Sequence, residues 1–457
     1  MTLAPSARPI PAAFAAALDP STDDPPAGRP APVPAPTRAT EAPRGADLLV
    51  VGAGVMGAWT AFWARAGGAG PGGRAGGGRS VTLLDAWGTG HLRATSGDET
   101  RIIRSAHGAD RLYTRWSRRA REHWLRFSEE WEVPLLLRTG VLWFAHRRGG
   151  FEDASASTLA AEGIPYEVLP PDELLARWPQ LGAGGSLTHA LYEPEGGTLM
   201  ARRGCQAVTA AFQAAGGTYA LAAVRPGRAE GGRLLEAVDQ EGRAWSAGTF
   251  VFACGPWLPR LFPDVLGSLI RVTKQDVVFV GPPEGDRRFH AGALPAWCDY
   301  DAAYYGTPAI DERGFKLAPD RYGPIFDPSR GERVVDPDSL RLARAYLRQR
   351  FPVLAGAPVV ETRVCQYEAT PDTHFVIDRH PAYDNVWLVG GGSGHGYKHG
   401  PRIGEYVVTR LDEAPEGAEH GTDEARFRLG PRRAGAGEEE SGMRTGGDEM
   451  AASWDLF

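Results

Sequence analysis

The 457-residue sequence lacks features that mark several classes of protein. No apolar run approaches the roughly 20 residues of a membrane-spanning helix, so we expect no contact with a membrane. Lys and Arg form no block of like charge and the net charge is −6, so nothing indicates binding to nucleic acid. The first residues show no clear basic segment before an apolar one, which argues against a secretory signal.

Cysteine is scarce, with 4 residues in the chain. A chain with few cysteines fits a reducing compartment, so we expect a cytoplasmic protein. Their positions match neither a disulfide framework nor the ligand spacing of a zinc site, and we expect no metal; they are Cys205, Cys254, Cys298 and Cys365.

Both ends of the chain have compositions that predict disorder. Residues 1–44 are rich in Pro and Ala, and residues 414–457 are rich in Gly, Glu and Arg. Neither segment can bury enough apolar surface to offset the entropy lost on ordering. We therefore expect the folded part within residues 45–413.

What the sequence does contain is a glycine-rich turn between a strand and a helix. Residues 48–51 are typical of a buried strand and residues 58–66 of a helix. In such a turn the first glycine allows the tight bend, the second leaves room for a pyrophosphate, and the third lets the helix pack on the strand. The phosphates then lie at the positive end of the helix dipole. The turn is a G-x-G-x-x-G motif made of Gly52, Ala53, Gly54, Val55, Met56 and Gly57.

A second strand, residues 80–84, ends at Asp85. An acidic residue in this place accepts a hydrogen bond from a ribose hydroxyl, usually about 20 residues after the glycines. The distance is longer here because a Gly-rich insertion occupies residues 68–78. We interpret the insertion as a flexible surface loop without a chemical role.

Two arginines, Arg101 and Arg104, follow in the segment GDETRIIR. One interpretation is a pair of surface arginines. The other is a buried pair, because the neighbouring Ile102 and Ile103 are apolar and a buried arginine requires an anion. The second interpretation would place the pair close to a bound cofactor.

A second strand–loop–helix with glycines occurs near the end of the chain. Residues 386–389 are typical of a strand, residues 390–398 form a Gly-rich loop, and residues 401–411 are typical of a helix. A second loop of bare backbone suits another electronegative part of a cofactor. Two such loops suggest a long cofactor that is held at both ends, and FAD is one candidate.

Other segments predict an ordinary mixture of helices and strands. Residues 111–131 form an amphipathic helix whose basic face is expected to be solvated. Residues 135–145 are interpreted as a strand pair with a turn, and residues 192–215 as a loop followed by a helix. A Gly-Pro turn at Gly255 ends the strand at residues 249–253; it either faces a ligand or is an ordinary turn.

Taken together, these motifs resemble the D-amino-acid-oxidase superfamily of FAD enzymes, and within it the sarcosine oxidase and N-methyltryptophan oxidase group. The matching pieces occur in family order over nearly all of residues 45–413. They are GAGVMG at 52–57, Asp85, GDETRIIR at 97–104, EGGTL at 195–199, Val224, ACGPW at 253–257, YYG-x-P at 304–308, PD-x-HFVID at 371–378 and GSGHGYK at 392–398.

The resemblance implies an α/β (α+β) fold of two entwined domains. A Rossmann-type FAD-binding domain would comprise residues 45–110, 185–260 and 355–413. A substrate-binding domain, built on a large mixed or antiparallel sheet, would comprise residues 111–184 and 261–354.

The resemblance also implies residue roles. Arg101 would lie near the flavin ring, and Arg104 would pair with a substrate carboxylate. Tyr305 and His395 would line the pocket, with a structural role as plausible as a catalytic one. The ADP half would be held by Gly52, Gly54, Gly57, Asp85, Ser96 and Val224, and the pyrimidine end of the flavin by Gly392, Gly394, His395, Gly396, Tyr397 and Lys398.

The activity implied is oxidation of an amine to an imine by hydride transfer to flavin N5, with O2 as the acceptor. The substrate would be a secondary or cyclic amine, or an amino acid, that bears a carboxylate, and the protein a monomer or homodimer. Three alternatives stay open: a flavin dehydrogenase with another acceptor, an NAD(P)-dependent enzyme, and a flavin-binding protein without turnover.

The sequence departs from the family at three positions. Arg313 stands where the flavin-linking cysteine is expected, which predicts non-covalent FAD. The only lysine in residues 256–275 is Lys274, which aligns poorly with the lysine that activates oxygen. A second carboxylate-binding lysine is expected near Ala369 and is absent, so either substrate anchoring rests more on Arg104 or the substrate differs.

Overall fold

The structure is a computed structural model that describes residues 45–67, 78–182, 184, 187–411 and 424–432. The insertion at 68–78 lies outside these residues except for residue 78, and the N-terminal segment 1–44 lies wholly outside them. Of the predicted C-terminal tail only residues 424–432 are described.

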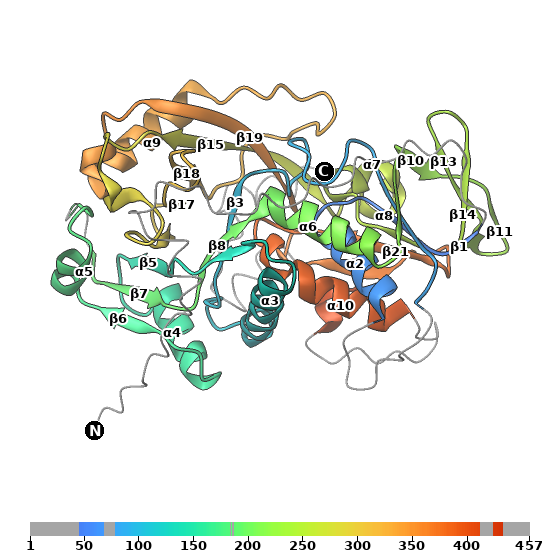
Figure 1. The fold of residues 1–457 in the computed structure, drawn as a ribbon, viewed down its shortest axis with the longest axis horizontal. Helices are drawn as coiled ribbons and strands as arrows, with labels where there is room; N and C mark the ends of the chain where they lie inside the picture. Colours follow the sequence, from blue (N-terminus) through green and yellow to red (C-terminus); the bar gives the residue numbers. More distant parts are fainter. Residues whose placement is uncertain (1–44, 68–77, 183, 185–186, 412–423, 433–457) are drawn as a thin grey trace.

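The first of two large sheets is built around parallel strands, on the right in Figure 1. Strand β1 (Ala46–Val51) pairs with β2 (Val81–Asp85) and with β14 (Ala244–Phe252), which in turn pairs in parallel with β21 (Val386–Gly390). Their apolar runs are buried, as expected for strands covered on both faces. Further strands complete this sheet: β9 (Thr218–Leu221), β10 (Val224–Pro226), β13 (Glu236–Asp239) and β20 (Val376–Arg379).

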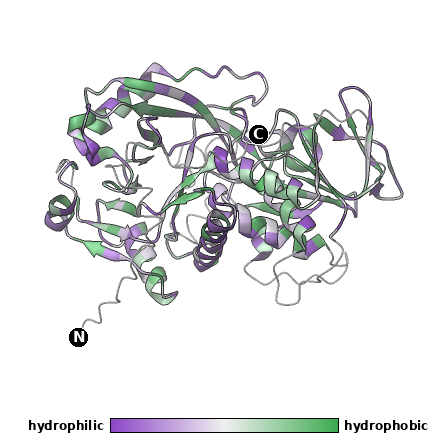
Figure 2. Ribbon diagram, in the orientation of Figure 1, coloured by the Kyte–Doolittle hydropathy of each residue, from purple (hydrophilic) through white to green (hydrophobic). Residues whose placement is uncertain are grey.

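Two helices that follow the glycine-rich loops pack on one another. They are α2 (Val55–Ala66) and α10 (Gly400–Leu411). A Cβ atom added at Gly404 would lie 2.6 Å from the backbone carbon of Trp59, so the two helix backbones nearly touch. Helix α3 (Arg111–Glu130) packs beside them, buries Trp124 and Phe127 against Trp59, and turns a hydrophilic side outward (Figure 2).

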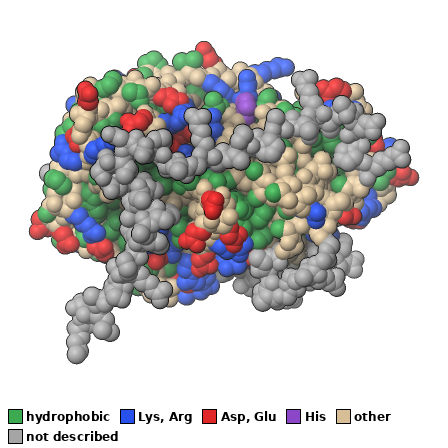
Figure 3. All heavy atoms as spheres, in the orientation of Figure 1, with side chains coloured by type: hydrophobic (Ala, Val, Ile, Leu, Met, Phe, Trp, Pro, Cys, Tyr) green, Lys and Arg blue, Asp and Glu red, His purple; other side chains and the backbone are tan. Residues whose placement is uncertain are grey.

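The basic face of α3 is engaged in ion pairs. Arg111 and Arg115 lie 2.7 and 3.0 Å from the carboxylate of Glu162. Figure 3 shows basic and acidic side chains intermingled on the face in view. This mixture agrees with the absence of a basic block in the sequence.

The second large sheet has the strand order β19-β15-β18-β17-β16-β5-β7-β6. Its pairs are antiparallel except for β16 and β5. Helix α9 (Pro337–Arg350) packs against it, with α5 (Pro171–Arg177) and α4 (Phe151–Ala161) at the other end (Figure 1). The strands are β5 (Val141–Ala145), β6 (Glu167–Leu169), β7 (His189–Glu193), β15 (Arg271–Val280), β16 (Ala296–Asp299), β17 (Tyr304–Thr307), β18 (Phe315–Pro319) and β19 (Val359–Ala369).

Smaller elements connect the two sheets. A three-stranded sheet contains β3 (Thr100–Ile103), β8 (Gly197–Met200) and β4 (Leu136–Leu137). Helix α6 (Ala201–Ala214) continues directly from β8. The remaining elements are the hairpin β11 (Ala229–Glu230) and β12 (Arg233–Leu234), helices α7 (Leu258–Leu261) and α8 (Pro263–Leu266), and 3-10 turns η1 (Gly255–Trp257), η2 (Arg287–Phe289), η3 (Pro352–Leu354), η4 (Tyr397–His399) and η5 (Glu424–Phe427).

The fold class expected from the sequence is confirmed, but three local expectations are wrong. Residues 135–145 do not form a strand pair, because β4 pairs with β8 while β5 pairs with β7 and β16. The expected loop before α6 contains β8. Residues 424–432, expected to be disordered, include the buried Phe427, which packs on Trp116 of α3. The proposed domain boundaries stay a prediction.

Among the described residues, no helix combines the length and apolar character needed to cross a membrane.

We expect Gly404→Ala to destabilise the protein. Alanine favours helix by about 1 kcal/mol over glycine. The new methyl group would overlap the backbone of α2, which cannot rotate away, and overpacking of this kind costs about 1–3 kcal/mol. The net result is a lower unfolding midpoint, measured by thermal or urea denaturation. In the control Gly356→Ala the added atom has nothing within 4 Å, so its midpoint stays unchanged; equal midpoints for both variants would contradict the packing argument.

Candidate functional site

A cavity of about 510 Å³ is lined by residues from both large sheets. Val51 and Asp85 come from strand ends of the first sheet. Val277, Cys298 and Tyr305 come from the second. The cavity therefore extends from the nucleotide-binding strands to the sheet that would hold a substrate.

The two glycine-rich loops meet at this cavity because of strand order. Strands β1 and β21 both lie beside β14 and run parallel to it, so their carboxyl ends lie at the same edge of the sheet. In open sheets of this kind ligands bind outside the carboxyl ends of the strands. Two loops some 340 residues apart in the chain are thereby brought to one site.

The three glycines of the first turn have different surroundings. A Cβ at Gly52 would lie 2.4 Å from the Ala253 carbonyl oxygen, and one at Gly57 would lie 1.9 Å from the Gly52 carbonyl oxygen. Backbone packing therefore requires glycine at both positions. A Cβ at Gly54 would meet only the Ser96 hydroxyl, at 3.4 Å, so this position leaves bare backbone open to a ligand.

Most of the predicted cofactor residues line the cavity, but two do not. Ala53 and Gly57 lie behind the turn and support it instead of facing the cavity. The lining includes Gly52, Gly54, Val55, Met56, Asp85, Ser96, Arg101, Val224, Gly255, Gly392, Gly394, His395, Gly396, Tyr397 and Lys398.

Asp85 organises the first turn. Its carboxylate accepts hydrogen bonds from the backbone N–H groups of Ala53, Trp87 and Gly88 at 2.8 to 2.9 Å. A carboxylate offers about four acceptor sites, so one remains for a ribose hydroxyl. Burial raises the pKa of Asp85, although the three N–H donors favour the charged form. Ser96 accepts from the N–H of Val55 at 3.1 Å and so caps the helix that follows the turn.

The second loop is fixed by contacts to distant elements. Tyr397 donates from its hydroxyl to the Ala201 carbonyl at 2.6 Å and stacks on Trp124. The Lys398 ammonium donates to the His395 carbonyl at 2.9 Å. These contacts leave the glycine backbone facing the cavity, as a flavin ring would require.

The sequence analysis did not identify Glu368, a buried acidic residue beside this loop. Glu368 is 5% exposed; one carboxylate oxygen lies 3.4 Å from the Gly392 N–H, and the other has no partner among the described residues. Burial raises its pKa to about 7. The only signal in the sequence is an acidic residue just before the TPD motif, and spacing alone does not distinguish it from a surface residue.

Arg101 is held by four acceptors. Its guanidinium donates to the Asp98 carboxylate at 2.7 Å, to the carbonyls of Thr95 and Thr100 at 2.6 and 2.7 Å, and to the Cys365 sulfur at 3.4 Å. Asp98 also binds the buried ammonium of Lys316. Burial alone would raise the pKa of Asp98, but Lys316 and Arg101 together lower it. Sequence reasoning found Arg101 but missed Asp98 as its partner and Lys316 as the second cation bound to Asp98.

Arg104 shares the cavity with a second basic residue, Lys398. Its guanidinium stacks 4.9 Å above the Trp143 ring and donates to the Ala106 carbonyl. Lys398 lines the same cavity, and burial together with Arg104 lowers its pKa well below the ordinary value. That substrate anchoring rests mainly on Arg104 stays a prediction, and Lys398 is a second basic residue in the same cavity.

Tyr305 also lines the cavity. Burial raises its pKa, so the phenol stays protonated near neutral pH. His395 also lines the cavity, but its Nε2 is 3.0 Å from the Thr373 carbonyl and serves the loop. Whether either residue takes part in the reaction stays a prediction.

The other departures concern residues outside the cavity. Arg313 is 45% exposed and pairs with Glu99 and Glu361. Lys274 pairs with Asp276 at 3.3 Å. Neither residue lines the cavity.

Comparisons with known proteins agree with this geometry. The model of the DAO family, described as FAD dependent oxidoreductase, matches residues 47–410. Monomeric sarcosine oxidase of Bacillus sp. (strain NS-129) is 28% identical over 79% of this chain and 92% of its own length. N-methyl-L-tryptophan oxidase of Salmonella arizonae is 26% identical over 81% and 95%. The structure of L-proline dehydrogenase from P. horikoshii matches with a TM-score of 0.70 and 19% identity over 87% of this chain and 99% of that chain, which shows a shared fold.

We expect Glu368→Gln to flatten the pH dependence of stability. Because the pKa of Glu368 is raised in the folded protein, its contribution to the free energy of unfolding is fully present below pH 4.5. This contribution is lost as the pH rises through about 7. Glutamine cannot ionise, so the variant should exceed the wild-type unfolding midpoint more at pH 8 than at pH 5. Thermal denaturation across this range checks the difference. The exposed control Glu284→Gln should follow the wild type; parallel curves for Glu368→Gln would show that its carboxyl does not titrate there.

Proposed function

The chain belongs to the family of FAD-dependent oxidoreductases, and we propose that it oxidises the carbon–nitrogen bond of a small secondary or cyclic amine bearing a carboxylate. The resemblance found in the sequence is confirmed, and the cofactor is FAD rather than NAD(P). The observation that carries the substrate class is the presence of Arg104 and Lys398 in the cavity that both glycine loops border.

The residues around the cavity fit FAD. Gly54 offers bare backbone at the N-terminus of α2 for a pyrophosphate, and Asp85 has an acceptor site for a ribose hydroxyl. The unpartnered oxygen of Glu368 and the Gly392–Gly396 backbone suit the polar edge of a flavin. Bound FAD supplies the oxidising power, by accepting a hydride from the carbon next to the amine nitrogen. Arginine at position 313 favours non-covalent binding, which acid precipitation would reveal as release of the flavin.

The protein orients the substrate through its carboxylate. Arg104 presents a planar fork that matches two carboxylate oxygens, and stacking on Trp143 fixes the plane of that fork. Trp143 is in turn held by a 2.8 Å hydrogen bond from its indole to the buried Glu193. The apolar lining excludes water and favours the neutral form of the amine, from which a hydride is most easily lost.

The acceptor and the assembly belong to the same proposal. The names of the sequence relatives, both oxidases, support O2 as the acceptor, whereas a flavin dehydrogenase is the alternative. We further propose a cytoplasmic monomer or homodimer, since all four cysteines are free. Cell fractionation and analytical ultracentrifugation test the compartment and the oligomeric state.

Anaerobic addition of an N-methyl amino acid should bleach the flavin absorbance of the purified protein. The reason is that electrons pass from substrate to flavin and have no further acceptor. Readmitting air should restore the band and yield about one peroxide per amine consumed, as expected of an oxidase. Restoration only with an artificial acceptor would favour the dehydrogenase. A panel of carboxylated secondary amines that leaves the band unchanged would contradict the proposed substrate class.

We expect Arg104→Gln to raise the apparent KM for an N-methyl amino acid by about 10- to 100-fold, because a hydrogen bond to a charged group contributes about 1.5–3 kcal/mol. For the matching N-methylalkylamine without a carboxylate the change should be small. Steady-state kinetics on both substrates measure the difference. Arg348→Gln, on the exposed side of α9, serves as the control. An equal rise in KM for both substrates would contradict the proposed contact between Arg104 and the substrate carboxylate.

A further inference from the structure

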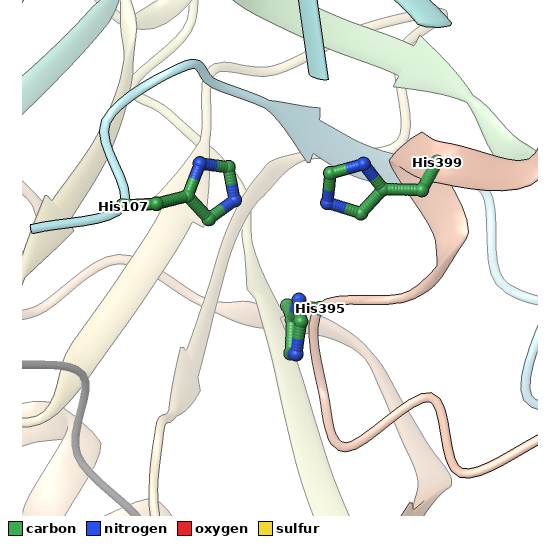
Figure 4. A group of neighbouring side chains, drawn as sticks. All are labelled: His107, His395 and His399. Carbon is green, nitrogen blue, oxygen red and sulfur yellow. The ribbon is translucent and has the colours of Figure 1, made fainter. Parts of the chain in front are cut away.

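Three histidines converge beside the second glycine loop. His107 follows β3, His395 lies in the loop, and His399 ends the 3-10 turn η4. Figure 4 shows the rings of His107 and His399 facing one another, with His395 approaching the space between them. One ring nitrogen from each residue lies within 4.8 Å of the other two.

The cluster is shielded from solvent. His107 and His399 are 0% exposed and His395 is 8% exposed. Aromatic rings enclose the cluster. The ring centroid of Tyr113 lies within 5.8 Å of the centroids of all three imidazoles, and the Phe375 ring stacks on His395. Polar nitrogen atoms in such a place require partners, since an unpaired buried polar group costs about 1–3 kcal/mol.

Hydrogen bonds outside the cluster fix two of the tautomers. Nδ1 of His107 lies 3.0 Å from the Ser105 carbonyl, and Nε2 of His395 lies 3.0 Å from the Thr373 carbonyl. Carbonyl oxygens only accept, so each of these nitrogens carries the proton. The other nitrogen of each ring, Nε2 of His107 and Nδ1 of His395, therefore presents a lone pair.

These lone pairs have no donor. Neither inward nitrogen has a partner among the described residues, and neither nitrogen of His399 has one. A neutral His399 contributes a single N–H, which cannot satisfy both lone pairs. Histidines that bind a metal usually donate the N–H of one ring nitrogen to a backbone carbonyl, which orients the ring, and bind the metal through the other nitrogen. His107 and His395 have this arrangement.

We propose that His107, His395 and His399 bind one divalent transition-metal ion, for which Zn²⁺ is the reference. Three imidazoles without a carboxylate or thiolate suit zinc, copper or nickel, rather than magnesium or calcium. Around a tetrahedral zinc with Zn–N bonds of about 2.0–2.1 Å, ligand nitrogens lie about 3.3 Å apart. The three ring nitrogens here lie within 4.8 Å of one another, which is wider. Side-chain rotations that move each nitrogen by about 1 Å would bring them to the spacing of a zinc site.

The surroundings of the cluster both assist and oppose a cation. Hydrogen bonds to the Ser105 and Thr373 carbonyls assist it by turning lone pairs of His107 and His395 inward. Arg104 and Lys398, which line the same cavity as His395, act against a cation. The histidine geometry is therefore decisive, and the opposing charges predict a moderate affinity.

A bound ion would connect two segments of the proposed substrate site. His107 lies three residues after Arg104, and His399 directly follows Lys398. Coordination would fix the segments that carry these two cations relative to each other. The metal site itself does not depend on the proposed substrate, because its residues and their partners are independent of what the cavity binds.

Zinc titration of the FAD-loaded, chelator-treated protein tests the proposal. Calorimetry should show one ion per chain, and X-ray absorption at the zinc edge should show three imidazole nitrogens at about 2.0 Å. Loss of an outer partner of a ligand already costs about 10- to 100-fold in metal affinity, so His399→Gln should weaken binding at least about tenfold. His290→Gln, in the second sheet region, should bind zinc as the wild type does.

Three results would overturn the proposal. They are zinc binding of equal strength in wild type and His399→Gln, an absorption spectrum without imidazole ligands, and wild-type protein that takes up no zinc. Flavin content and the thermal midpoint verify folding of the variant. If His399→Gln does not fold, the zinc affinity of His107→Gln and the X-ray absorption spectrum of the wild type test the proposal instead.

Discussion

The backbone contact between Gly57 and Gly52 is the constraint on which the rest of the site depends. It brings the start of α2 against the end of β1 at a distance that no side chain would permit. Gly52 in turn lies against Ala253 at the end of β14, so two strand ends and the start of a helix are drawn together. Only with this packing do the N–H groups of α2 face the cavity, where they can meet a phosphate.

A second constraint connects the three-stranded sheet to the second large sheet through buried charge. Asp98, in the loop before β3, binds Arg101 and also Lys316 of β18 in the second sheet. A buried ion pair contributes little net stability, but loss of one partner leaves an uncompensated charge, so the network specifies how the sheets meet. The chain contains only three lysines, and two of them, Lys316 and Lys398, are buried in or beside the site.

The sequence predicted best what is encoded locally. The first turn and the second glycine loop are strand–loop–helix patterns in which each part identifies the next. The turn near Gly140 was misinterpreted because a glycine at a bend does not say whether the chain reverses onto itself or crosses to another sheet. Strand β19 was missed because charged residues such as Glu361 and Arg363 interrupt its apolar pattern.

Contacts between distant segments could not be read from spacing. Arg104 and Lys398 line one cavity because strand β3 packs against the turn η4, and spacing along the chain does not predict this contact. The same holds for Glu368, which differs from a surface acid only by its burial, and for the three histidines. Phe427 of the tail is buried because α3 and α10 leave an aromatic recess, formed in part by Trp116 and Tyr406.

The distribution of hydrogen bonds among the cations determines which of them can bind a ligand. Arg101 donates to four acceptors and is committed to holding its loop. Arg104 donates to one carbonyl, and its remaining N–H groups have no partner among the described residues. A carboxylate entering the cavity would therefore bind at Arg104, next to Lys398, and its amine would lie in the apolar part of the cavity. There desolvation disfavours the ammonium form, so the contact that anchors the proposed substrate also places its nitrogen where the reactive neutral amine is favoured.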